Sequence, residues 1–270
     1  MTIEIANSDA VRGRFRFALF DFDGTLSLIR EGWQDVMAPF FVEELRGCPR
    51  CESAERVELV VREFVTRLTG KQTIYQCFQL AEEVEKRGGR PQEPLVYKHE
   101  YLARLWARIE QRVSELKSRA VPPEQWLLRG SVEFLDALKA RGIALYLASG
   151  TDLQYVLDEA RALQLDHYFG ENIFAALDDY RAFSKQQIID RILTEHGLSG
   201  PELLVVGDGY VEIENGKGVG GFAMGVASDE ANPGGIDEWK RERLLNAGAD
   251  IIVRDYAETN EIVDYLFSGG

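Results

Sequence analysis

After a Val-Pro-Pro break at residues 121–123, short apolar runs alternate with amphipathic helical stretches, and this alternation is the feature that most restricts the fold. Strands separated by helices join as right-handed crossovers, which makes them parallel neighbours in one sheet. We therefore expect an α/β fold with a doubly wound parallel sheet. The predicted strands are residues 15–20, 143–148, 173–177, 203–206, 222–226 and 251–253.

The segment from residue 31 to residue 120 has a different texture. Its long stretches, such as 53–68, 72–87 and 95–120, are rich in charge and carry apolar residues at helical spacing. It contains no convincing strand, so we predict a bundle of about four helices. The expected organisation is an α/β core of residues 1–30 and 121–270, with a helical domain of residues 31–120 inserted after the first strand.

Composition narrows the classes of function. The 270 residues include 31 Lys and Arg against 45 Asp and Glu, a formal net charge of −14. Such a balance argues against nucleic-acid or anionic-membrane partners, although it permits a small anionic ligand. No apolar run approaches the length needed to span a bilayer, no signal-like core begins the sequence, and the three cysteines are too few for a disulfide framework. We expect a soluble cytoplasmic protein and leave its oligomeric state open.

Three polar breaks each follow a predicted strand. They are Asp21-Phe22-Asp23-Gly24-Thr25, then residues 149–151 (Ser-Gly-Thr), then residues 207–209 (Gly-Asp-Gly). In a parallel sheet, ligands collect at the carboxyl ends of the strands. The sequence therefore predicts one site built from three strand ends.

The residue types at these breaks favour phosphate chemistry. Asp21 and Asp23 are two apart and can face one side of the chain, and Asp208 adds a third acid. Oxygen ligands without His or Cys suit a hard cation such as Mg²⁺. Ser149, Gly150 and Thr151 offer hydroxyl and N–H groups at a predicted helix start, where a helix N-cap is the alternative role for Ser149. Lys185 begins another predicted helix and could stabilise a transferring phosphoryl group.

The chain resembles the haloacid dehalogenase-like superfamily of phosphatases and phosphomutases. The resemblance rests on Asp21-Phe22-Asp23-Gly24-Thr25, Ser149-Gly150-Thr151, Lys185 and residues 205–209 (Val-Val-Gly-Asp-Gly), which occur in the family's order. It covers residues 14–30 and 121–268. The helical segment lies where many members insert a mobile cap that excludes water from the site.

The resemblance implies a role for each matching residue. Asp21 would be the nucleophile that forms an aspartyl-phosphate, and Asp23 the general acid and base. Ser149 and Lys185 would bind the phosphoryl oxygens. The side chains of Asp21 and Asp208, with the Asp23 backbone carbonyl, would hold Mg²⁺. Glu212 stands where the family usually has a second Asp, and a longer acid could reach the metal through water.

Other residues have both a functional and a structural interpretation. Thr25 and Gly150 could contact the phosphate, and Lys71 and Gln72, in a predicted interhelical loop of the cap, could reach the substrate. Arg30 and Trp33 could touch substrate or pack the entry to the cap, and Arg181 is the substitute if Lys185 is an ordinary surface lysine. Cys48 and Cys51 have metal-site spacing without a second pair, so we interpret them as a coincidence in a loop. We expect Asp229 and Glu230 at the solvated surface.

The function that we expect is Mg²⁺-dependent hydrolysis of a small phosphomonoester, such as a sugar phosphate. A phosphomutase would use the same nucleophile but pass the phosphoryl group to a sugar hydroxyl instead of water. A non-catalytic phospholigand-binding protein is the third possibility, which the presence of all three aspartates disfavours.

Overall fold

The computed structural model describes residues 3–268 and divides into two compact units. One unit contains the chain up to Glu31 together with the chain from Glu115 onward, and the other contains Gly32–Ser114. We refer to them as the core unit and the cap unit. Residues 1–2 and 269–270, which the sequence assigns to the core, lie outside the described residues.

The core unit is built on a seven-stranded sheet in the order β1-β7-β6-β5-β2-β3-β4. Six of its strands are parallel, and this confirms the predicted fold class. β1 is an addition to the prediction, a three-residue strand that pairs antiparallel with β7 at one edge. The strands are β1 (Ile3–Ile5), β2 (Phe17–Phe20), β3 (Ala144–Asp152), β4 (Ile173–Ala176), β5 (Leu203–Gly207), β6 (Phe222–Val226) and β7 (Ile251–Val253).

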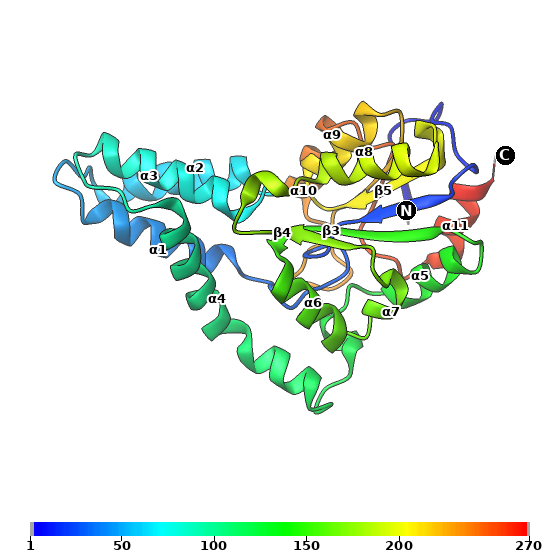
Figure 1. Cartoon of the computed structure of the whole chain (residues 1–270), viewed down its shortest axis with the longest axis horizontal. Coiled ribbons are helices and arrows are strands. Elements are labelled where there is room, and N and C mark those ends of the chain that lie inside the picture. Colours follow the sequence, from blue (N-terminus) through cyan, green and yellow to red (C-terminus); the bar gives the residue numbers. More distant parts are fainter. Residues whose placement is uncertain (1–2, 269–270) are drawn as a thin grey trace. The chain divides into compact units, whose positions relative to one another are not determined.

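Helices cover both faces of the sheet (Figure 1). Phe17 and Leu19 of β2 belong to the apolar cluster that includes Ile189 of α8. Phe20 faces the other way, with its ring centroid 6.1 Å from that of Phe134 in α5. The helices of this unit are α5 (Ser131–Lys139), α6 (Leu153–Ala162), α7 (Asp166–Phe169), α8 (Lys185–His196), α9 (Tyr210–Gly218), α10 (Glu238–Asn246) and α11 (Thr259–Phe267), with single 3₁₀ turns at Pro123–Trp126, Tyr180–Ala182 and Gly200–Glu202.

The register of the central strands places their ends level. Phe20, the last residue of β2, pairs with Leu147 of β3 on one side and with Val206 of β5 on the other. The residues that follow these three positions therefore emerge at the same edge of the sheet. The strand order thus brings together the three polar breaks that the sequence singled out.

The cap unit is helical, with α1 (Gln34–Arg46), α2 (Ala54–Leu68), α3 (Thr73–Lys86) and most of α4 (Pro94–Lys117), and no strand lies within its residues 32–114. In α2, Ser53 caps the first turn by accepting a hydrogen bond from the Arg56 N–H. Val57, Val61 and Phe64 follow at helical spacing and are fully buried. No helix in the described part of the chain is both long and apolar enough to cross a membrane.

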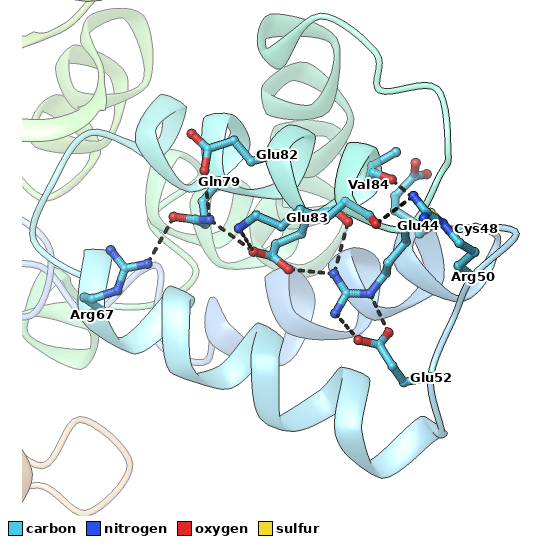
Figure 2. Close-up of polar contacts among 11 residues, drawn as sticks. Glu44, Cys48, Arg50, Glu52, Arg67, Gln79, Glu82, Glu83 and Val84 are labelled. Atoms are coloured by element: carbon cyan, nitrogen blue, oxygen red, sulfur yellow. Dashed lines mark hydrogen bonds and ion pairs between the residues drawn. The ribbon is translucent and has the colours of Figure 1, made fainter.

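A buried arginine, Arg87, joins two parts of the cap unit through Glu52 and Glu83, both of which are labelled in Figure 2. Arg87, just after α3, donates two hydrogen bonds to the Glu52 carboxylate, at 2.7 and 3.0 Å, and one to Glu83 at 2.6 Å. Cys48 is buried nearby, with its thiol directed at the Glu44 and Val84 carbonyls. The interpretation of the Cys48 and Cys51 pair as a coincidence stays a prediction.

Candidate active site

The nucleophile candidate, Asp21, lies at one end of a buried ion-pair chain, with Lys185 in the middle and Glu212 at the other end. Lys185 Nζ is 2.9 Å from Asp21 Oδ1 and 2.8 Å from Glu212 Oε2. All three side chains are at most 10% exposed. Lys185 is therefore not an ordinary surface lysine. It is held there by α8, whose first turn is capped when Ser184 Oγ accepts a hydrogen bond from the Gln187 N–H.

Glu212 is fixed by its position in the first turn of α9. Its Oε1 accepts a 2.6 Å hydrogen bond from the Gly209 N–H, which satisfies a backbone donor at the helix start. Burial raises the pKa of Glu212 to about 7 and that of Asp21 to about 6, although Lys185 opposes both shifts. Burial disfavours the charge on Lys185, but Asp21 and Glu212 outweigh it, so the pKa of Lys185 lies above its usual value. This ion-pair chain therefore keeps Lys185 protonated.

Asp208 is braced on two sides. Its backbone N–H donates to Thr25 Oγ1 at 3.0 Å, and the Thr25 hydroxyl donates to Asp208 Oδ1 at 3.4 Å. Asp208 Oδ2 lies 2.8 Å from Lys240 Nζ. Gly24 makes this approach possible, because its φ is +73° and a Cβ there would come within 2.3 Å of Asp208 Oδ2.

Lys240 also binds Glu230, with 2.6 Å between Nζ and Oε1. The expectation that Glu230 is solvated surface is therefore wrong, because its side chain is 19% exposed and packs against the site. Burial raises the pKa of Glu230 in spite of Lys240. Thr25 is itself fully buried, and contact of its hydroxyl with a substrate would require its bonds to Asp208 to break.

Asp23 lies on the other side of the strand end. Its Oδ2 accepts a hydrogen bond from Thr151 Oγ1 at 2.8 Å and a longer one from Ser149 Oγ at 3.4 Å. Arg30 Nε is 3.7 Å from Asp23 Oδ1. Burial raises the pKa of Asp23 to about 6, and Arg30 opposes the shift. Arg30 itself is buried and pairs with Glu159.

One expectation about Ser149 and Gly150 is wrong in its local structure. β3 does not end before Ser149 but continues to Asp152, with an irregular register from Ser149 to Asp152, and α6 begins only at Leu153. Ser149 is therefore not the N-cap of a helix. Its Oγ instead accepts a hydrogen bond from the Thr151 N–H, which closes a tight turn that includes Gly150.

A metal ion could be held by one group of acids in the described residues, Asp21, Asp208 and Glu212, whose oxygens lie within 4.8 Å of one another. The group is rich in carboxylate oxygen and lacks nitrogen or sulfur donors, which fits Mg²⁺. The Asp23 carboxylate is not part of the group. Its predicted contribution, through the backbone carbonyl, stays a prediction.

The cap residues singled out from the sequence have defined local positions. Gln72 is buried and precedes α3, and Lys71 Nζ lies 5.8 Å from the centroid of the Tyr75 ring. Their contact with a substrate stays a prediction. Trp33 precedes α1.

Sequence reasoning missed Lys240 and Glu159. Neither belongs to a motif, and each reaches the site from a helix whose charged residues look like ordinary surface.

A largely parallel α/β sheet, acidic residues at the carboxyl ends of its strands and a helical insertion are together typical of one class of hydrolases. The model of the haloacid dehalogenase-like hydrolase family matches residues 15–220, and the chain belongs to this family. No curated protein sequence matches the chain at a significant level.

Solved structures show the same fold at low sequence identity. A predicted phosphoglycolate phosphatase from Haemophilus somnus aligns with a TM-score of 0.59 and 16% identity, over 92% of this chain and 98% of that one. CbbY from Rhodobacter sphaeroides, in complex with phosphate, aligns with a TM-score of 0.56 and 18% identity, over 90% and 96%. A family hydrolase from Deinococcus radiodurans with bound phosphate and sodium gives 0.54 and 19%, over 94% and 97%.

Proposed function

We propose that this hydrolase is a Mg²⁺-dependent phosphatase of small phosphomonoesters that works through an aspartyl-phosphate on Asp21. The observation that carries the proposal is the geometry around Asp21. Its carboxylate lies 2.9 Å from a buried lysine and belongs to a group of three acids suited to a hard cation. The phosphate bound in two of the similar structures supports the substrate class.

Each step of the proposed reaction can be assigned to a residue of the site. An Asp21 oxygen attacks phosphorus, and the bond from phosphorus to the leaving oxygen breaks as Asp23 donates a proton to that oxygen. Asp23 next removes a proton from the water that attacks the aspartyl-phosphate, which releases inorganic phosphate and restores Asp21. Lys185 offsets the negative charge that gathers on the transferring group.

The metal site has a defined part in this proposal. Asp21 and Asp208 would hold Mg²⁺, with Glu212 contributing directly or through water. Bound there, the ion would supply positive charge beside the phosphoryl oxygens, and this would lessen their repulsion of the Asp21 carboxylate. Lys71 and Gln72 are our candidates for contacts with the rest of the substrate. We propose the cap unit as a lid that excludes water.

The test measures phosphate release from a panel of phosphomonoesters with Mg²⁺ or with EDTA. We expect metal-dependent release that falls by on the order of 10³-fold or more in Asp21→Asn. The matched control is Asp9→Asn, at an exposed aspartate. A hydroxylamine-sensitive phosphoprotein should be trapped in the wild type and absent from Asp21→Asn. Release that survives in Asp21→Asn would contradict the mechanism, and transfer of the phosphoryl group to a sugar hydroxyl would favour a mutase.

A further inference from the structure

Arg30 and Glu159 form a buried pair behind Asp23. Arg30 Nη2 donates to Glu159 Oε1 at 2.7 Å, and Arg30 Nε donates to Oε2 at 3.1 Å. The two side chains are 7% and 1% exposed. This two-point contact fixes the plane of the guanidinium, and the Tyr155 ring, with its centroid 5.4 Å away, gives it a further contact.

The two oxygens of Asp23 have different surroundings. Oδ2 is held by the Thr151 hydroxyl at 2.8 Å. Oδ1 is buried and, among the described residues, has no hydrogen-bond partner, although Arg30 Nε is only 3.7 Å away. The side chain as a whole is 25% exposed. Because Oδ1 is buried, Oδ2 is the oxygen that can meet a leaving group.

The ion pair between Arg30 and Asp23 is therefore loose and includes no hydrogen bond to Oδ1. A charge-assisted N–H···O bond is about 2.8 Å long, so a shift of about 1 Å would close it. That shift would draw Oδ1 towards the guanidinium and turn Oδ2 away from Thr151. Glu159 opposes it, because both of its oxygens hold Arg30 on the side of α6.

We infer that Glu159 is a positioning residue for the general acid, and that it acts by keeping Arg30 from forming a hydrogen bond with Asp23. The inference rests on the proposed function. Without the Glu159 charge, Arg30 would lose its two-point partner while the Asp23 carboxylate lies 3.7 Å away, and the attraction between these opposite charges would draw the pair together. Asp23 would then lie away from the leaving oxygen.

The experiment compares two esters of similar size that differ in leaving group. Phenyl phosphate needs a proton on its leaving oxygen, whereas p-nitrophenyl phosphate releases a stable anion. The quantity measured is kcat/KM, which covers the steps up to loss of the leaving group. In Glu159→Gln we expect the loss with phenyl phosphate to exceed the loss with p-nitrophenyl phosphate at least about tenfold. The double variant Arg30→Gln, Glu159→Gln removes the competing cation and should restore most of the difference.

Each failure has its own signature. If the wild type hydrolyses neither these esters nor any member of the panel, the proposed function fails. If the wild type is active and Glu159→Gln lowers both esters equally, or the double variant shows no recovery, this inference is overturned while the proposed function stands.

A second comparison distinguishes an effect on the position of Asp23 from poor folding of Glu159→Gln. In an Asp23→Asn background, Glu159→Gln should add no leaving-group selectivity, because the group on which it acts is gone. Thermal melting of every variant identifies those that fold. Glu159→Asp, which keeps the charge, should retain most of the wild-type ratio of kcat/KM between the two esters. Added selectivity in the Asp23→Asn background would overturn the inference.

Discussion

Lys185 Nζ lies 2.9 Å from Asp21 Oδ1, and both side chains are buried. A carboxylate at this depth keeps its charge at neutral pH only with a cation beside it, because burial alone favours the protonated acid. A cation beside Asp21, such as Lys185, is therefore needed to keep this carboxylate ionised and nucleophilic.

Lys185→Met should lower kcat by on the order of 10²–10³-fold, because the negative charge that gathers on the transferring group would lose its buried cation. Phosphate release with saturating Mg²⁺ measures the effect. The control is Lys139→Met, at an exposed lysine of α5. Activity within a few fold of the wild type in Lys185→Met would remove Lys185 from the mechanism.

Protonation of Glu212 should contribute to the pH dependence of the stability of the fold. Its pKa is about 7 in the metal-free fold against an ordinary 4.5, so between these values the folded protein holds a proton that the unfolded chain has lost. The stability that this residue contributes is present below about pH 4.5 and is lost as the pH rises towards about 7. Melting in EDTA should therefore show a shallower fall with pH for Glu212→Gln than for the wild type. A steeper fall in the variant would contradict the assignment.

Lys240 neutralises two acids beside the proposed metal site. Lys240→Met leaves Asp208 and Glu230 uncompensated, so the metal-free variant should melt lower than the wild type. Added Mg²⁺ should then raise its melting temperature by more than it raises that of the wild type, because the ion replaces the missing charge. Lys240→Arg keeps the charge and should behave like the wild type. A smaller Mg²⁺ effect in Lys240→Met would mean that the lysine serves to shape the site for the ion.

Substitutions at Gly24 and Gly142 distinguish the cost of backbone strain from the cost of a steric clash. Both have positive φ, +73° and +75°, but a Cβ at Gly142 meets nothing within 4 Å, whereas one at Gly24 meets Asp208. Gly142→Ala should cost about 1 kcal/mol of stability with little change in activity. Gly24→Ala should cost more and should also abolish Mg²⁺-dependent activity. Urea unfolding and phosphate release check the two effects, and equal losses in both variants would count against the clash.

The Arg87 cluster makes a prediction for the cap unit alone. Arg87→Met leaves Glu83 and Glu52 without their shared partner and should destabilise the unit by about 3 kcal/mol, the usual cost of breaking a buried pair. Arg104→Met is the matched control, since Arg104 also binds two carboxylates but at the surface, where such pairs contribute less than about 1 kcal/mol. Urea unfolding compares them. Similar losses would mean that burial is not what gives the Arg87 cluster its strength.

The sequence predicted which residues of the candidate site lie close together wherever a motif follows a buried strand. Asp21 and Asp208 come together because apolar runs define β2 and β5, which pair in parallel. Local sequence signals failed where the structure depends on contacts between segments that are distant in the sequence. β1 is too short and too exposed to register as a strand, and the extension of β3 past Ser149 depends on its pairing with β4.

The pairing of Lys240 with Asp208 could not be predicted from the sequence either. It requires the loop after β6 to fold back and carry Glu230 with it, and nothing in the local pattern of α10 distinguishes this lysine from its exposed neighbours.

The division of the chain also sets an order of events during synthesis. The cap unit is one continuous segment, Gly32–Ser114, so it can fold on the ribosome as soon as it emerges. The core unit must wait, because β2 is flanked by strands that are translated more than a hundred residues later. Until then the apolar strand β2 stays without its partners. We expect chaperones to bind the nascent chain at the stage when the cap unit has emerged but β3 and β5 have not.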